Sequence, residues 1–242
     1  MSLLHKKHIN QALGDWPMFF KNQAIHATDS ALRRYYAAGL PEPGTPISAV
    51  PLIALDIETT GLNPSSDGIV SIGLVPFTLN RIRPNDGFYQ VVKPRWALKA
   101  RSVTIHRITH QQIEEAPDLD AILPEMLDRM AGRVPVVHYH PIERPFLDIA
   151  AQLRRQTAWR FPVIDTMALE ARWQRASIWS KTRRMIGLTP KSIRLADCRT
   201  RYALPAYAAH HALTDALATA ELLQAQVAWH FTPQSPLSEF WI

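Results

Sequence analysis

The segment LIALDIETTGL, residues 52–62, decides how the rest of the chain is interpreted. It opens with a short apolar run that alternates at its end, a pattern typical of a β-strand. Asp56 and Glu58 are two residues apart at the end of this strand, so both side chains point to the same face. Two carboxylates held so close repel each other unless a cation neutralises them. Hard oxygen ligands favour Mg²⁺ or Mn²⁺ over zinc.

The residues that follow this acidic pair make the segment more specific. A bare Asp-x-Glu pair is more often an ordinary strand end with solvated acids. Here Thr59, Thr60 and Gly61 come directly after the pair. They provide two hydroxyls and a tight turn, where a phosphate-bearing chain end can approach the backbone.

Outward from this segment, strand and helix patterns alternate along the chain. We expect a meander of three strands followed by alternating helices and strands, which indicates an α/β fold with a mixed sheet flanked by helices. The predicted strands are 52–58, 69–80, 87–93, 134–138 and 161–166. The predicted helices are about 103–110, 119–131, 142–154 and 212–228.

The sequence divides into three parts. Residues 1–46 are predicted to form a helical N-terminal extension and a proline-rich connector, with two helices packed on the main domain. Residues 47–232 are predicted to form the main domain, and 233–242 a C-terminal tail.

Composition limits the class of protein. Of the 242 residues, 47% are hydrophobic and 20% are charged, which is ordinary for a globular protein. The single cysteine, Cys198, excludes an intramolecular disulfide and a thiolate-rich metal site. The N-terminus has no apolar signal core, and the longest nearly apolar run, 69–79, is too short to span a bilayer, so we expect a cytoplasmic protein without a membrane partner. The net charge of +6 favours polyanionic partners.

A second acidic motif lies near the C-terminus, in AAHHALTDALATAELL, residues 208–223. His210 and His211 precede Asp215 by five and four residues, around the first turns of the last predicted helix, where they can share a face. A carboxylate and an imidazole on one short segment supply a metal ligand and a proton acceptor. Taken alone, the segment also fits a helix start with an ordinary surface aspartate.

The middle motif is VVHYHPIERPFL, residues 136–147, where a strand ends and a helix begins. Glu143 lies in the first turn of that helix. The helix dipole favours an acid there in any protein, so this position is not specific by itself.

Taken together, these motifs resemble the three exonuclease motifs of the DEDDh group of DnaQ-like nucleases, over residues 50–230. The resemblance rests on DIETTGL, on an acid after a strand ending in Val-Val-His, and on His-x-Ala-x-x-Asp-Ala. TIHRIT, residues 104–109, is similar to the His-Gly-Ile-Thr element of the family, with Arg107 in the glycine position. The resemblance implies a ribonuclease-H-like fold and a metal-dependent 3′→5′ exonuclease.

The resemblance also implies roles for the acids. Asp56, Glu58 and Asp215 would hold the first of two divalent ions, Mg²⁺ or Mn²⁺, with Asp56 bridging to the second. Glu143 would help to hold the second ion, and His210 would deprotonate the attacking water. Two such ions stabilise both the attacking and the leaving oxygen of a phosphodiester displacement.

The expected partner is the 3′ end of a nucleic acid. By the same resemblance, the residues expected to contact it are Thr59, Thr60, Gly61, Leu62 and His106. The stretch 172–201 has nine Lys or Arg residues and one acid, with Trp173 and Trp179 interleaved, so it can neutralise phosphates and stack bases, or present a solvated face with inward tryptophans.

Three positions depart from the family or leave a choice open. The family usually has Asp where this chain has Glu143, which moves the carboxylate by one methylene. A sister group has its tyrosine base at the position of His211, although the spacing favours His210. Asp165 matches a recurrent Asp-Thr that is not a metal ligand, so we expect a structural role.

Other functions and partners also remain open. One is a non-catalytic or weakly catalytic module that binds nucleic acid or a polymerase, and another is an oligoribonuclease-like enzyme for very short RNA or dinucleotides. The tail 234–241 is similar to some sliding-clamp-binding peptides, but a tail packed on the domain is preferred. The sequence does not choose between DNA and RNA.

Overall fold

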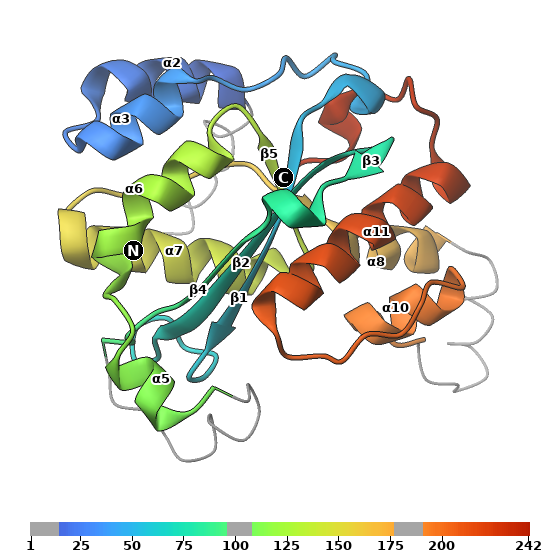
Figure 1. The fold of residues 1–242 in the computed structure, drawn as a ribbon. Coiled ribbons are helices and arrows are strands. Elements are labelled where there is room, and N and C mark those ends of the chain that lie inside the picture. The colour runs from blue at the N-terminus through green and yellow to red at the C-terminus, as the bar shows by residue number, and fades with distance from the viewer. Residues whose placement is uncertain (1–14, 96–107, 177–190) are drawn as a thin grey trace.

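The core of the protein is a mixed β-sheet covered by helices on both faces (Figure 1). The structure is a computed structural model that describes residues 15–95, 108–176 and 191–242. Its strands are β1 (Leu52–Thr59), β2 (Ile69–Thr78), β3 (Arg81–Ile82), β4 (Phe88–Val91), β5 (Val134–Val137) and β6 (Ile164–Asp165). Within the described residues the sheet has six strands in the order β3-β2-β1-β5-β6, with β4 also paired to β2.

The sheet combines an antiparallel meander with a parallel half. β2 runs antiparallel to β1 and to β4, which is the predicted three-strand meander. β5 runs parallel to β1, and β6 runs parallel to β5. The parallel strands need crossover connections, and helices supply them. The α/β class with a mixed sheet is therefore confirmed.

The central strand β1 is buried on both faces because helices cover each side. Ile53, Leu55 and Ile57 point into one core, whereas Leu52 and Ala54 point into the other. The first core is built with α2 (Trp16–His26), α3 (Ser30–Ala37), α6 (Leu119–Met130) and α7 (His140–Arg155). The second core involves α8 (Thr166–Ala176) and α11 (Ala212–His230), and α10 (Leu195–Arg201) packs on α11.

The two helices predicted for the N-terminal extension are present and pack on the main domain. Asp15 caps α2 and Asp29 caps α3, each accepting a backbone N–H of the first turn. α3 packs against α6. Phe20, Tyr35 and Tyr36 are fully buried in the first core, so these helices belong to the folded body.

The C-terminal tail also packs on the domain. Pro236 forms a β-bridge with Pro46 of the connector, and Trp241 forms one with Ile164 of β6. Leu237 and Phe240 are buried in the second core. The apolar side chains that a clamp-binding peptide would present are therefore buried inside the protein. This agrees with the preferred prediction of a tail packed on the domain.

Some boundaries differ from the predicted ones. The described helix α5 (His110–Glu114) begins where the predicted helix 103–110 ends, and most of that predicted range lies outside the described residues. β6 has two residues instead of the six predicted for 161–166. Across the part of the chain that the structure describes, no helix combines the length and apolarity needed to cross a membrane.

Candidate active site

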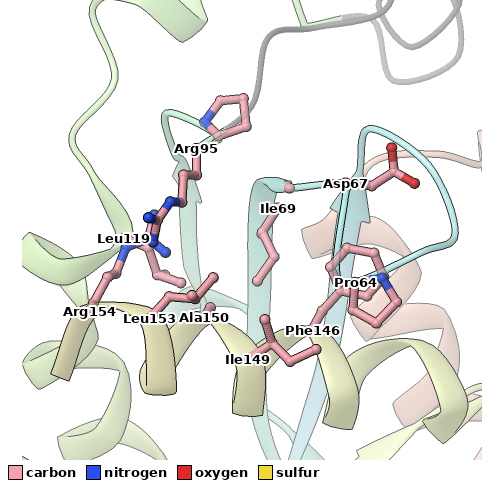
Figure 2. A pocket seen from close by; sticks show the side chains of 12 residues that line it. Pro64, Asp67, Ile69, Arg95, Leu119, Phe146, Ile149, Ala150, Leu153 and Arg154 are labelled. Carbon is pink, nitrogen blue, oxygen red and sulfur yellow. The ribbon is translucent and has the colours of Figure 1, made fainter. Parts of the chain in front are cut away.

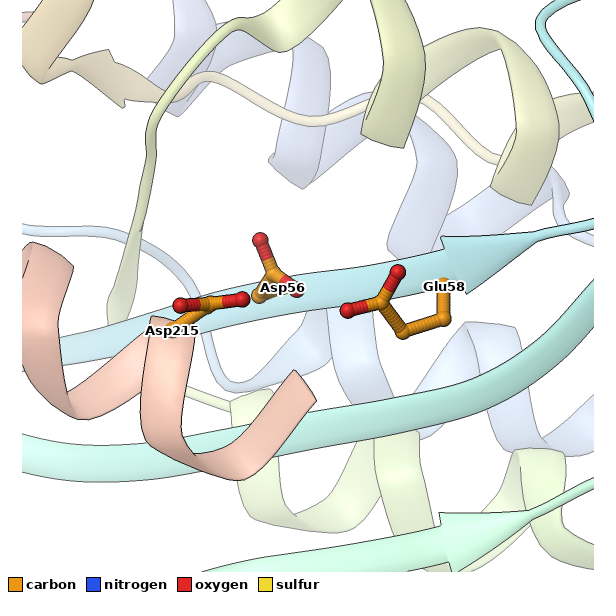
Figure 3. A group of neighbouring side chains, drawn as sticks. All are labelled: Asp56, Glu58 and Asp215. Carbon is orange, nitrogen blue, oxygen red and sulfur yellow. The ribbon is translucent and has the colours of Figure 1, made fainter. Parts of the chain in front are cut away.

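Three carboxylates from two distant parts of the chain meet at one face of the sheet. Asp56 and Glu58 project from β1, and Asp215 projects from the first turn of α11 (Figure 3). One ligand oxygen from each lies within 4.8 Å of the others. The predicted same-face placement of Asp56 and Glu58 is therefore present, and Asp215 completes the group.

A glycine in β2 allows α11 to begin this close to the acids. Gly73 pairs with Asp56 in the sheet register. A Cβ at Gly73 would lie 2.3 Å from the carbonyl carbon and oxygen of Ala212, the first residue of α11. Any side chain here would push the helix away, and Asp215 with it.

The acids make this site electrostatically unfavourable when no cation is present. Burial raises the pKa of Asp56 well above its ordinary range, and the charges of Glu58, Glu143 and Asp215 raise it further. Burial also raises the pKa of Asp215, with a contribution from Glu58. A set of hard oxygen donors under this repulsion fits a divalent cation.

Glu143 lies next to this group, in the first turn of α7. Its side chain is 3% exposed, and burial raises its pKa to about 8. Within the described residues its Oε2 atom has no hydrogen-bond partner. Glu143 is close enough for its charge to contribute to the raised pKa of Asp56. A buried carboxyl oxygen without a hydrogen-bond partner, near other acids, again fits a cation.

A hydrogen-bonded turn sets the position of Glu143. Tyr139, the residue directly before α7, has a φ of 105°, a left-handed conformation that a bulky residue rarely adopts. The buried carboxylate of Asp165 holds this turn by accepting the backbone N–H groups of Tyr139 and His140, at 3.2 and 2.9 Å. It also accepts two N–H groups at the start of α8 and bonds the His140 ring. Its contacts are therefore structural, as predicted.

The two histidines lie before α11, and the prediction that they share a face of the helix is wrong. His210 has a φ of 68°, and its backbone N–H donates to Oδ2 of Asp215 at 2.8 Å. This turn takes the chain away from the helical path. His211 stacks its ring on Tyr89 of β4, with centroids 4.4 Å apart. The His210 side chain is exposed at the edge of the acidic group.

The loop after β1 is held by its own side chains. The Thr59 hydroxyl donates to the carbonyl of Gly61 at 2.6 Å. Thr60 is buried, and its hydroxyl accepts a backbone N–H across the loop at 2.9 Å. Leu62, in contrast, is 81% exposed. The four loop residues predicted to contact nucleic acid thus differ in access to solvent, and His106 and Trp179 lie outside the described residues.

A small cavity lies between this loop and α7 (Figure 2). It is lined by apolar side chains of α7, including Ile149 and Leu153, and by Arg95 and Arg154. Its volume of about 20 Å³ holds roughly one water, so it is not a nucleotide site.

Sequence reasoning did not single out Gly73 or Tyr89. A glycine inside a predicted strand is a known sign of close backbone approach, so the signal for Gly73 was present in IVSIG. The stacking of Tyr89 on His211 joins residues far apart in the chain, and no local pattern indicates it.

Comparison with known families agrees with this geometry. Residues 53–223 match the family model RNase_T, described as Exonuclease. The chain belongs to this exonuclease family. The match begins within β1 and ends within α11, so it includes all four acids and both histidines.

Two curated relatives illustrate the range of this exonuclease family. The DNA polymerase III PolC-type protein of Thermotoga petrophila is 32% identical over 117 residues, which is 48% of this chain and 8% of the relative. The DNA polymerase III subunit epsilon of Treponema pallidum is 27% identical over 181 residues, 75% of this chain and 78% of the relative. The chain therefore spans less than a tenth of the first relative and most of the second.

Solved structures show the same fold. The nuclease domain of 3′hExo, a DEDDh family member bound to rAMP, superposes with a TM-score of 0.61 at 17% identity, covering 74% of this chain and 92% of that one. Cell-death related nuclease 4 superposes with a TM-score of 0.62 at 18% identity, covering 78% and 67%. The ribonuclease-H-like exonuclease fold is thereby confirmed.

Proposed function

We propose that the chain is a metal-dependent exonuclease that hydrolyses the phosphodiester bond at the 3′ end of a nucleic acid. One observation carries this proposal: Asp56, Glu58 and Asp215 bring ligand oxygens within 4.8 Å of one another in a chain of the exonuclease family. Carboxylates held this close repel one another, and a bound cation removes that repulsion.

The donor set fits two divalent ions, Mg²⁺ or Mn²⁺. Asp56, Glu58 and Asp215 would hold one ion, and Asp56 with Glu143 would hold the other. When bound, such ions stabilise the charge on the attacking and leaving oxygens. Glu143 must lose its proton to act as a ligand, so its raised pKa opposes metal binding below about pH 8.

His210 is the proposed proton acceptor for the attacking water. Its backbone is fixed to Asp215, and its exposed imidazole can reach solvent at the edge of the acids. His211 is the weaker candidate because its ring is stacked on Tyr89. Histidine is the side chain that most often serves as the general base in enzymes that work near neutral pH.

The substrate is proposed to be a nucleic acid strand with a free 3′ end. Support comes from the positive net charge and from solved relatives such as Exonuclease X in complex with 5′ overhanging duplex DNA. The exposed Leu62 and the Thr59–Gly61 turn border the acids and would contact the terminal nucleotide. The likeness to the epsilon subunit of Treponema pallidum supports a DNA polymerase as a partner. A purely binding module is not favoured, because all four acids and His210 are present.

The test follows 5′-labelled single-stranded DNA and RNA with Mn²⁺, Mg²⁺ or EDTA. We expect a ladder that shortens from the 3′ end only with metal, with the rate reduced at least about 10³-fold in Asp56→Ala and Asp215→Ala. A 3′-phosphorylated oligonucleotide should resist cleavage, because the enzyme needs a free 3′ hydroxyl. Intact substrate under all metal conditions would contradict the proposal.

A further inference from the structure

The loop between α10 and α11, residues 202–211, carries His210 and is tied to both helices by one buried arginine. Arg199 of α10 is 3% exposed. Its Nη1 donates to the carbonyl of Ala218 in α11 at 2.7 Å, and its Nη2 donates to the carbonyl of Pro205 in the loop at 2.8 Å. Its own carbonyl accepts the N–H of Leu204 at 3.0 Å. The first half of the loop is therefore fixed to the protein.

Two further side chains extend this attachment toward His210. The guanidinium of Arg199 lies over the ring of Tyr207, 4.6 Å from its centroid. The Tyr207 hydroxyl donates to Oε1 of Glu221 at 2.9 Å, and Oε2 of the same carboxylate accepts from Arg199 at 2.7 Å. Arg199, Tyr207 and Glu221, called the loop clamp below, thus form a closed set of contacts between α10, the loop and α11. Charge-assisted hydrogen bonds of this kind are the stronger ones in proteins.

The loop clamp ends three residues before His210. On the other side, the His210 N–H is held by the carboxylate of Asp215. Between these two points the backbone at His210 takes a φ of 68°, which a non-glycine residue keeps only when its surroundings hold it. Residues 205–211 are exposed, so burial does not fix them. Tyr207 is therefore the nearest side-chain anchor upstream of the proposed base.

We infer that the loop clamp positions His210, with Tyr207 as a positioning residue that acts on the reaction only through that histidine. The inference rests on the proposed function of His210 as the base. Holding a base in its reactive geometry contributes to the rate without contributing to substrate or metal affinity. Loosening the loop should therefore lower kcat and leave KM and metal binding unchanged.

The test is a double-mutant cycle with Tyr207→Phe and His210→Ala. Tyr207→Phe removes the hydrogen bond to Glu221 and keeps the ring under Arg199. In the wild-type background we expect kcat to fall on the order of tenfold, with KM and the Mn²⁺ dissociation constant within about twofold. In the His210→Ala background the same substitution should change kcat less than about twofold, because the residue through which it acts is gone.

Tyr202→Phe is the matched control. Tyr202 also donates its hydroxyl to a carboxylate, Oε2 of Glu170 at 3.0 Å, but that bond does not hold the part of the loop next to His210. The kcat of Tyr202→Phe should stay near that of the wild-type protein. Thermal unfolding of each variant checks that the fold is intact.

An equal fall of kcat in both backgrounds, or no fall in either, would overturn the inference. Failure of the proposed function looks different. In that case the wild-type protein itself has no metal-dependent activity, or His210→Ala retains full activity.

Discussion

At the scale of single residues, Glu143 is the acid whose ionisation state is most altered by the fold. Burial raises its pKa from an ordinary value of 4.5 to about 8, so without metal it keeps its proton at neutral pH. The folded protein thus binds more protons than the unfolded chain between about pH 4.5 and pH 8. Stability of the metal-free protein is therefore greatest at the acidic end of this range and falls as pH rises through 8.

This gives a prediction for thermal unfolding in EDTA. Between pH 5 and pH 8 the Tm of the wild-type protein should fall, by about 2–4 °C for each kcal/mol lost. Glu143→Gln cannot ionise, so its Tm should fall less over the same range. Part of the slope should remain, because the pKa of Asp56 is also raised. Parallel curves for the two proteins would show that Glu143 does not carry a raised pKa.

At the scale of elements, the site depends on how closely α11 approaches the sheet. Gly73 of β2 provides that approach because its hydrogen leaves room for the backbone of Ala212. The same contact sets the distance from Asp215 to Asp56, which pairs with Gly73. An outward shift of α11 would therefore move Asp215 away from Asp56, and these two residues are proposed ligands of the same ion.

We predict that Gly73→Ala weakens metal binding and lowers kcat, and that these effects exceed those of a loss of strand stability alone. The added methyl forces α11 outward, so the Mn²⁺ dissociation constant should rise roughly tenfold or more, and kcat should fall by about 10²-fold. Gly44→Ala is the control, since nothing lies within 4 Å of its Cβ position. Calorimetric titration with Mn²⁺ measures the affinity. Normal affinity in a folded Gly73→Ala protein would refute the role given to this contact.

The elements predicted from sequence and those observed agree where local patterns determine them. β1, β2 and α7 follow from the apolar pattern and α11 from its richness in alanine and leucine, and the pairing of Asp56 with Glu58 on one face follows from strand geometry. The arrangement of His210 and His211 does not follow from local patterns. The His210 N–H bonds the side chain of Asp215 five residues on, in a turn that apolar patterning does not show, and the His211 ring stacks on Tyr89, which is distant in the chain.

At the scale of the whole molecule, the acids meet only when the sheet and both helical layers are in place. Asp56 and Glu58 come from the central strand, Glu143 from α7 on one face, and Asp215 from α11 on the other. The N-terminal helices complete the first core, and the C-terminal tail completes the second. The order of the three acidic motifs was readable from the sequence, whereas the packing of both termini into the cores rests on contacts between distant residues.

The most direct test of the central claim is the anomalous diffraction of Mn²⁺ in crystals of the protein at pH 8. We predict one anomalous peak bound by Asp56, Glu58 and Asp215, and a second between Asp56 and Glu143, about 4 Å from the first. Both should disappear in Asp56→Ala crystals. The absence of any peak among these acids at millimolar Mn²⁺ in wild-type crystals would contradict the account.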